Sequence, residues 1–309
     1  MRILVVGAGA TGGYFGARLA EAGRDVTFLV RPVRADQLRR DGLRVLSPHG
    51  DVKLRPRLLV EGETTEPFDV VILAVKAFGL TRAFDDFAPA VGRETMIVPF
   101  LNGMRHIDML VGRFGAKPVL GGVCAVATTL DRHGRIVQLV GGLQALAYGE
   151  RDGARSERLR ALDQDMQGAG FDARLSTTIM QDMWEKWVML ASAGAVTCLM
   201  RGNVGEIQAA EGGADLTRRC IAEIAAIAAA SGYPPREAFI EGTRAMLTEK
   251  GSSLATSMYR DLLNGQPVEV EHILGDLTLR ARELGLDAPL LEAATVKLRV
   301  YQNRLAPRA

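Results

Sequence analysis

Residues 2 to 13, RILVVGAGATGG, contain the pattern that decides the fold. A short apolar run rich in β-branched residues ends in glycine, as expected of a strand buried on both faces of a sheet. Gly7, Gly9 and Gly12 then give the spacing GxGxxG. Between a strand and a helix, such glycines permit a tight turn, a close approach of backbone N–H groups to a pyrophosphate, and close helix packing. An ordinary βα turn is the alternative, but this context favours a dinucleotide site.

The first half of the chain continues to alternate strand and helix patterns, whereas the second half is helical. Short connections between strands and helices indicate parallel strands joined by right-handed crossovers. We therefore predict an α/β fold, with an N-terminal Rossmann-type doubly wound parallel sheet followed by an all-α C-terminal domain. The predicted domains are residues 1–177 and 178–309. Strands are expected at 2–6, 25–30, 69–75, 96–101 and 171–176, helices at 11–23 and 35–42, and a hairpin across 131–135.

The residue after the second predicted strand indicates which cofactor is bound. NAD-binding proteins place Asp or Glu there, whereas this chain has Arg31, with Arg34 nearby. A guanidinium binds a 2′-phosphate bidentately, and an acid would repel it. The pattern favours NADPH over NADH, with a solvated surface arginine as the alternative.

Polar residues also follow two later strands. Lys76 follows residues 69–75, and Asn102 follows residues 96–101. Each could simply end its strand, but ligands bind beyond the carboxyl ends of parallel strands, and two such residues together favour a site lining. The predicted cofactor-binding residues are Gly7, Gly9, Ala10, Thr11, Gly12, Arg31, Lys76 and Asn102.

Composition excludes several other classes of protein. Thirty-eight basic and 36 acidic residues are spread through the chain, and no apolar run reaches the roughly 18 residues of a spanning helix, so neither nucleic-acid nor membrane binding is expected. The three cysteines lack metal spacing and indicate reduced thiols in a cytoplasmic protein. Four scattered histidines give no metal site. The sequence does not distinguish a monomer from a homodimer.

Lys186 is the candidate proton donor. It lies within MWEKWVMLASAGAVTCLM (183–200), and on a helix its neighbours are Met183, Met189 and Leu190. A lysine on an apolar surface that faces a cleft suits acid catalysis. An ion pair with Asp182, or a lysine that extends to solvent, is the alternative.

Two further candidates come from the segment 256–277. Glu269 lies beside the apolar positions of a predicted helix that Pro267 can open, and Ser257 precedes another helix. Glu269 could simply complement a helix dipole, and Ser257 could be only a cap.

In its order of motifs, the chain resembles the ketopantoate reductases (2-dehydropantoate 2-reductases) over nearly its whole length. The motifs are GAGATGGYFGARLA, Arg31, LAVKA, LNGM, VLGGVCAVATTLDRHG, the lysine helix with GEI (205–207), and SMYRDLLNGQPVEVEHILGDL. The resemblance implies a Rossmann domain, a helical domain and an active site in the cleft between them. It also implies NADPH-dependent reduction of 2-dehydropantoate to pantoate, a step of pantothenate biosynthesis.

The same resemblance implies roles for individual residues. Lys186 would protonate the ketone oxygen while the cofactor delivers hydride to the adjacent carbon. Asn102 would lie beside the nicotinamide and the carbonyl, and Lys76 would line the cofactor cleft. Glu269 would hydrogen-bond the substrate and position Lys186, and Ser257 would bind the substrate's carboxylate.

Three positions depart from the family pattern, in which they carry asparagine. They are Leu190, Gly194 and Leu254. Loss of amides predicts a less polar pocket, because polar groups that bind a substrate discriminate strongly. A reductase of a different, less polar 2-oxo acid or carbonyl compound is therefore one alternative to pantoate formation. A non-catalytic NADPH-binding sensor is the other.

Overall fold

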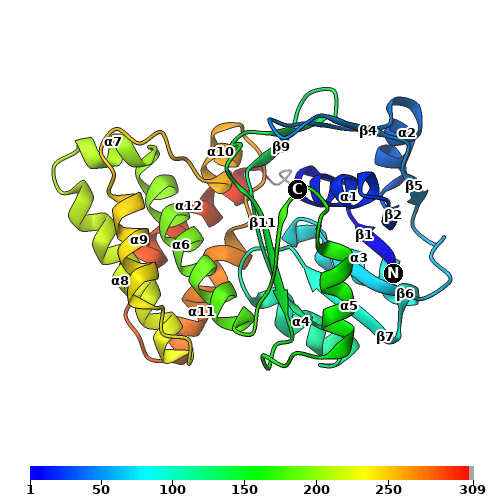
Figure 1. The fold of residues 1–309 in the computed structure, drawn as a ribbon. Coiled ribbons are helices and arrows are strands. Elements are labelled where there is room, and N and C mark those ends of the chain that lie inside the picture. The colour runs from blue at the N-terminus through cyan, green and yellow to red at the C-terminus, as the bar shows by residue number, and fades with distance from the viewer. Residues whose placement is uncertain (306–309) are drawn as a thin grey trace. The chain divides into compact units, whose positions relative to one another are not determined.

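The computed structural model describes residues 1–305 and divides the chain into two compact units. The first unit contains Met1–Leu101 and His106–Met180. The second contains Asn102–Arg105 and the chain from Gln181 onward. In Figure 1 the strands belong to the first unit and the second is built of helices. The short segment Asn102–Arg105 thus belongs to the helical unit although it lies in the first half of the sequence.

The main sheet of the first unit has five strands, all parallel. Their order reverses at β1, because the chain first builds outward on one side of β1 and then returns to the other. This arrangement confirms the predicted Rossmann-type doubly wound sheet. Across the sheet the strands are β5 (Arg57–Leu59), β2 (Asp25–Leu29), β1 (Arg2–Val6), β6 (Phe68–Leu73) and β7 (Val91–Pro99).

A glycine explains where the helix after β1 ends, and a proline explains where the helix after β2 begins. Helix α1 (Ala10–Glu21) ends just before Gly23, whose φ of 78° belongs to the left-handed region. Helix α2 (Pro32–Asp41) begins earlier than the sequence indicated, because proline is well suited to a first helical turn. The other helices of this unit are α3 (Leu80–Phe87), α4 (Arg105–Phe114) and α5 (Glu157–Met166).

Two smaller sheets complete the first unit, and the sequence did not separate them from the main sheet. The predicted hairpin across residues 131–135 is confirmed, since Ile136 pairs with Leu130 in an antiparallel ladder. One sheet contains β4 (Val52–Leu54), β3 (Leu43–Leu46), β10 (Ile136–Gln138) and β9 (Thr128–Leu130). The other contains β12 (Asp172–Leu175), β11 (Gln144–Gly149) and β8 (Gly121–Val126).

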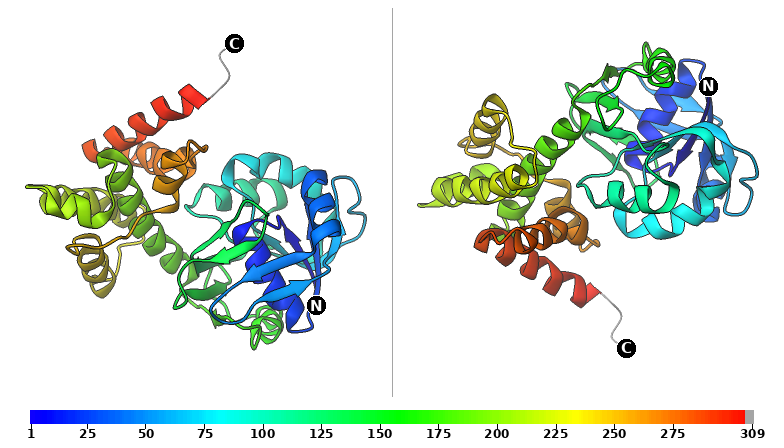
Figure 2. Two further views of the ribbon diagram at one scale, coloured as in Figure 1. Left: turned by 90° about the horizontal axis from the view of Figure 1, so that it is seen from above. Right: turned by 90° about the horizontal axis from the view of Figure 1, so that it is seen from below.

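The second unit is entirely helical over the residues that the structure describes, as predicted. Figure 2 shows its helices around the long α6, which is buried from Ala191 to Cys198. The helices are α6 (Ile179–Met200), α7 (Val204–Ala209), α8 (Gly213–Ala230), α9 (Glu237–Leu247), α10 (Ser257–Leu263), a π-helical turn η3 (Glu271–Gly275), α11 (Asp276–Glu283) and α12 (Pro289–Leu305). Among residues 1–305, no helix has the length and apolar character needed to cross a membrane.

The helical segment before α11 differs from the prediction in two details. It begins at Val270, three residues after Pro267. Val270, Ile273 and Leu277 are buried as predicted, but Leu284 is 41% exposed, because it follows the end of α11.

One arginine anchors the start of α6. The backbone N–H and the Nε of Arg236 both donate to Oε1 of Glu185, each at 2.8 Å, and a terminal guanidinium nitrogen donates to Asp182 at 2.9 Å. Glu185 is buried, and burial alone would raise the pKa of its carboxyl, but the hydrogen bonds from Arg236 outweigh burial and hold that pKa below its ordinary value. Both acids adjacent to Lys186 in this turn therefore bind Arg236.

We expect Arg236→Ala to lower the free energy of unfolding by roughly 2 to 3 kcal/mol at neutral pH, because it leaves a buried carboxylate without its cation. Arg282→Ala is the matched control, since Arg282 pairs with Glu292 at an exposed site and should cost less than about 1 kcal/mol. Urea unfolding at several pH values measures both.

The pH dependence has a definite sign. The Glu185 carboxyl has a lowered pKa in the folded state, so its contribution is present above its unfolded pKa and is lost as pH falls through the folded value. The difference between wild type and Arg236→Ala should therefore shrink on acidification. A difference that stays constant down to strongly acidic pH would contradict this assignment.

Candidate active site

The three glycines of the turn between β1 and α1 have different structural roles. Gly7 has φ 99°, which favours glycine, and a Cβ there would lie 2.9 Å from the carbonyl oxygen of Ala74. A Cβ on Gly12 would lie 2.2 Å from the carbonyl oxygen of Gly7 and 2.6 Å from Cβ of Ala74. No atom lies within 4 Å of the Cβ position of Gly9. The first and third glycines thus serve close packing, whereas the second faces open space.

That open space suits a pyrophosphate. Gly9 is the N-cap of α1 and provides no side-chain cap, so the first N–H groups of the helix, including those of Ala10 and Thr11, depend on other acceptors. A helix N-terminus also carries partial positive charge. The residues present therefore fit the phosphates of a nicotinamide dinucleotide.

Arg31 and Lys76 lie at the same edge of the main sheet. Strands β2 and β6 flank β1 in parallel, and Arg31 and Lys76 follow their carboxyl ends as the N-caps of α2 and of a short 3₁₀ turn (Ala77–Gly79). Both side chains are exposed. The structure thus brings Arg31, Lys76 and the glycine turn to one edge of one sheet.

Arg34, expected near the same phosphate, makes different contacts. Its Nε donates to the carbonyl oxygen of Ala8 at 3.1 Å, and a terminal nitrogen donates to that of Gly134 at 3.0 Å. Arg34 therefore connects the glycine turn to the β9–β10 turn.

In the second unit, Lys186 lies next to a buried hydrogen bond. Lys186 is half-buried on α6. Its neighbour Trp187 is 1% exposed and donates its indole N–H to the carbonyl oxygen of Ile273 at 2.9 Å. Glu269, also half-buried, precedes the same π-helical turn, and its carbonyl accepts the N–H of Ile273 at 3.1 Å. The neighbour of Lys186 and the backbone of Glu269 thus both hydrogen-bond to Ile273 of η3.

Gly103, the residue after Asn102, packs against the same π-helical turn, η3. Gly103 is buried with φ 82°, and a Cβ there would lie 2.3 Å from the carbonyl oxygen of His272 and 3.6 Å from Nε1 of Trp187. The backbone beside Asn102 therefore packs directly on η3. Asn102, Lys186 and Glu269 come from three distant parts of the sequence, and each lies within a few residues of this one packing contact.

Ser257 is not the cap that one interpretation of the sequence suggested. Thr256 caps α10, because its hydroxyl accepts the N–H of Tyr259 at 3.1 Å. Ser257 is the first helical residue and is exposed. Its hydroxyl is thus not committed to capping.

Met258, the residue after Ser257, packs on α6 at Gly194. A Cβ on Gly194 would lie 2.6 Å from Cε of Met258, so the absence of a side chain on α6 lets the methionine of α10 pack there. Leu190 and Leu254 are half-buried. None of the three positions at which the resemblance implies asparagine therefore carries an amide.

His272, one of the four scattered histidines, lies in η3 and is half-buried. Burial, followed by the charge of Arg105, lowers the pKa of its imidazole, while Glu271 opposes the shift. Only its position beside Glu271, close to Glu269 in sequence, could have drawn attention to it. No group of three potential metal ligands occurs among residues 1–305, and Cys124, Cys198 and Cys220 are buried and form no disulfide.

Comparison with known proteins identifies the family to which this fold and these motifs belong. A family model described as ketopantoate reductase PanE/ApbA matches residues 3–153, and the model of that family's C-terminal part matches residues 178–302. The chain belongs to the ketopantoate reductase family. It is therefore an oxidoreductase that acts on CH–OH groups with a nicotinamide cofactor.

Two relatives span nearly the full length of the chain. The uncharacterized oxidoreductase YkpB of Bacillus subtilis (strain 168) is 39% identical and covers 98% of this chain and 99% of its own. The 2-dehydropantoate 2-reductase of Mesorhizobium japonicum is 29% identical over 97% of each chain.

Solved structures agree with this assignment. The 2-dehydropantoate 2-reductase of Geobacter metallireducens superimposes with a TM-score of 0.87 at 27% identity, over 97% of this chain and 99% of its own. D-mandelate dehydrogenase, at 19% identity and a TM-score of 0.86 over 99% of each chain, shares the fold.

We expect Gly12→Ala and Gly9→Ala to affect different properties, the first the stability of the fold and the second the binding of the cofactor. Gly12→Ala should lower the free energy of unfolding by about 1 to 3 kcal/mol, because its Cβ meets backbone. Gly9→Ala has room for its Cβ and should keep wild-type stability while weakening cofactor binding. Thermal unfolding and fluorescence titration with NADPH measure the two effects; unchanged affinity in Gly9→Ala would contradict the proposed pyrophosphate position.

Gly103→Ala should lower kcat by roughly 10- to 100-fold, because displacement of Asn102 by even 1 Å disturbs catalytic geometry. Cofactor affinity should change less than kcat, since the glycine turn predicted to hold the pyrophosphate is untouched. Gly112→Ala on α4 is the control, because no atom lies within 4 Å of its Cβ position. Equal kcat in the two variants would show that the contact with η3 does not position Asn102.

Proposed function

We propose that this enzyme uses NADPH to reduce a 2-oxo acid with an apolar side chain to the corresponding 2-hydroxy acid. When bound, the nicotinamide supplies the hydride. With that hydride delivered to the carbonyl carbon, the ammonium of Lys186 would donate one proton to the ketone oxygen. Lysine then regains its proton from water, so the net change is one hydride and one proton added to the substrate.

The other residues hold the reactants. Gly7, Gly9, Ala10, Thr11 and Gly12 cradle the pyrophosphate, while Arg31 and Lys76 contribute positive charge toward the 2′-phosphate. These assignments rest on the GxGxxG context, on the shared sheet edge, and on the absence of an acid at position 31.

On the substrate side, Asn102 lies beside the carbonyl, and Glu269 hydrogen-bonds the substrate and positions Lys186. Ser257 binds the carboxylate; its exposed hydroxyl at the first turn of α10 is compatible with that role. A lysine with its stem among apolar residues protonates a developing alkoxide more effectively when water is excluded.

We infer the class of substrate from the packing of Met258 against Gly194. In 2-dehydropantoate the group beyond the ketone bears a hydroxyl, and a site built with amides would hold it. Here Leu190, Gly194 and Leu254 offer no hydrogen bond at the corresponding positions. D-mandelate dehydrogenase, which has the same fold, was solved with anilino(oxo)acetate, whose ring is apolar. An apolar 2-oxo acid therefore suits this site best.

Reduction of 2-dehydropantoate is the second candidate. It is supported by relatives of that name that span nearly the whole chain, such as the enzyme of Mesorhizobium japonicum. In that case the enzyme would act in pantothenate biosynthesis.

The test is steady-state oxidation of NADPH, with NADH as comparison, against 2-dehydropantoate, phenylglyoxylate, 4-methyl-2-oxopentanoate and pyruvate. We expect kcat/KM for the best apolar substrate to exceed that for 2-dehydropantoate by roughly tenfold or more. Lys186→Ala should lower kcat about 10²- to 10⁴-fold. Lys250→Ala, an exposed lysine of the same unit, should have no effect.

Leu254→Asn makes the test sharper. Because it restores an amide where the family has one, it should shift the preference toward 2-dehydropantoate. A wild-type enzyme that prefers 2-dehydropantoate would favour the second candidate. Full activity in Lys186→Ala would overturn the role of the lysine, and binding of NADPH without turnover of any substrate would contradict the proposed substrate class.

A further inference from the structure

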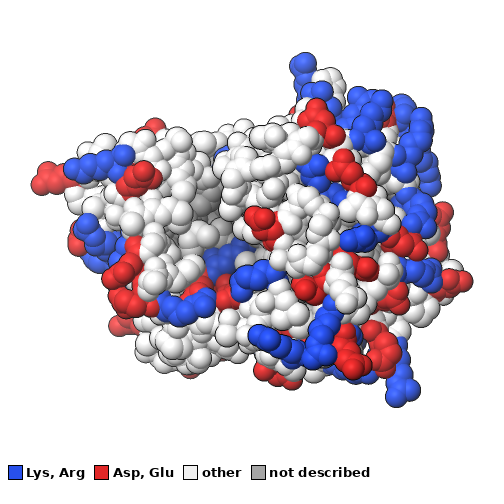
Figure 3. Space-filling view, in the orientation of Figure 1, with Lys and Arg blue, Asp and Glu red and all other residues white. Residues whose placement is uncertain are grey.

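A cavity of about 520 Å³ opens in the first unit between α2, the start of β3 and the β9–β10 turn. Five arginines and one histidine line it, with Asp41 as the acid among the lining residues. Figure 3 shows Lys and Arg side chains gathered over the end of the unit that carries α2. We call this cavity the arginine pocket; its basic residues are Arg34, Arg40, Arg44, Arg132, His133 and Arg135.

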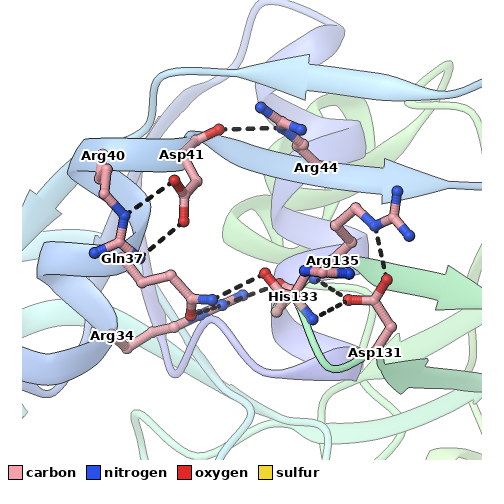
Figure 4. A network of polar contacts seen from close by, with 9 residues as sticks. Arg34, Gln37, Arg40, Asp41, Arg44, Asp131, His133 and Arg135 are labelled. Carbon is pink, nitrogen blue, oxygen red and sulfur yellow. Dashed lines mark hydrogen bonds and ion pairs between the residues drawn. The ribbon is translucent and has the colours of Figure 1, made fainter.

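Carboxylates neutralise two of the five arginines. Arg40 donates to both oxygens of Asp41, at 3.1 and 3.0 Å, and Arg135 donates to Asp131 at 2.7 Å. Figure 4 shows these two pairs on either side of the network. The pocket therefore keeps the charge of the other three arginines.

Arg34, Arg44 and Arg132 donate to neutral groups instead. Arg44 donates to the backbone carbonyl of Asp41 at 3.1 Å, and Arg132 donates to the imidazole of His133 at 3.1 Å. Arg34 donates to the carbonyls of Ala8 and Gly134. Such contacts orient a guanidinium without cancelling its charge. Burial lowers the pKa of Arg34 from its ordinary value, as expected of a cation that no carboxylate stabilises.

The pocket extends well beyond the predicted position of the cofactor's 2′-phosphate. The residues that line it include neither the glycine turn nor Arg31 nor Lys76. Arg31 is the N-cap of α2, whereas Arg40 lies in its last turn. At about 1.5 Å per residue along a helix, these two positions are roughly 13 Å apart. A single phosphate at Arg31 cannot also contact the far end of the pocket.

Three cations from three segments of the chain determine the chemistry of the ligand. Guanidinium groups bind phosphate oxygens in a planar, bidentate manner. One carboxylate or one singly charged anion leaves two of the three cations unmatched. The volume is that of a site for a small molecule rather than for a polymer.

We propose that the arginine pocket is a second anion site, which binds a small molecule carrying a diphosphate or two phosphate groups while the nicotinamide cofactor occupies its own site. The proposal does not depend on which 2-oxo acid the enzyme reduces.

The test uses inorganic pyrophosphate as the probe and the enzyme saturated with NADPH, so that the cofactor's phosphate sites are filled. Isothermal titration at fixed ionic strength without divalent cations should show one pyrophosphate per chain. The double variant Arg44→Ala/Arg132→Ala should weaken binding by roughly 30-fold or more, because it removes two charged hydrogen-bond donors. NADPH-dependent turnover should stay at the wild-type level.

Two comparisons make the result decisive. Arg39→Ala/Arg93→Ala removes the same charge from exposed arginines outside the pocket and should leave pyrophosphate binding unchanged; equal loss in both variants would show general attraction only and overturn the site. Arg31→Ala should raise KM for NADPH but not for NADH. The same selective rise in Arg44→Ala/Arg132→Ala would assign the pocket to the cofactor and overturn the proposal.

Two further outcomes would also overturn it. One is the absence of pyrophosphate binding to the enzyme saturated with NADPH. The other is tighter binding of citrate, a polycarboxylate of comparable charge, because that would contradict the phosphate chemistry assigned to the three guanidinium groups.

Discussion

The backbone of α1 lies against the turn that precedes it, and only the hydrogen atom of Gly12 separates the helix from the carbonyl oxygen of Gly7. This close approach fixes where the helix begins and therefore where its first N–H groups point. Gly9, one turn earlier, can then stay open on the side where a pyrophosphate would come. Arg34 also stabilises this turn, because its Nε donates a hydrogen bond to the carbonyl oxygen of Ala8. The proposed cofactor site of the first unit is thus a result of backbone packing more than of side-chain chemistry.

A comparable constraint organises the second unit. The π-helical turn η3 exposes backbone carbonyls that an ordinary helix would satisfy internally, and π-turns occur often at functional sites. The carbonyl of Ile273 accepts from Trp187, and that of His272 lies against Gly103. Arg236 meanwhile holds the acids beside Lys186 at the start of α6. Trp187, Gly103 and the backbone of Glu269 thus meet at η3, so the candidate residues Lys186 and Asn102 lie next to this turn in the chain.

The sequence predicts features that depend on local pattern. The GxGxxG turn, the parallel strands and the helical second half follow from apolar periodicity and from glycine, and the structure has them. Features that depend on tertiary contact were missed. Strands such as β4 are only three residues long, too short for a periodic signal. Thr256 and Ser257 are both suitable caps by type, and only the backbone geometry selects Thr256. The π-turn has no sequence signature here, because packing of Trp187 and Gly103 against it determines its shape.

The segment Asn102–Arg105 makes the helical unit a discontinuous domain. A fragment that starts near residue 178 carries Trp187 and η3 but not the glycine that packs on them. Cutting the chain once cannot release that unit whole. During synthesis, Asn102–Arg105 also leaves the ribosome long before α6 and η3 exist. It cannot make its contacts with them until most of the chain has been synthesised. The helical unit can therefore be completed only late in folding, when this early segment meets the helices that are made last.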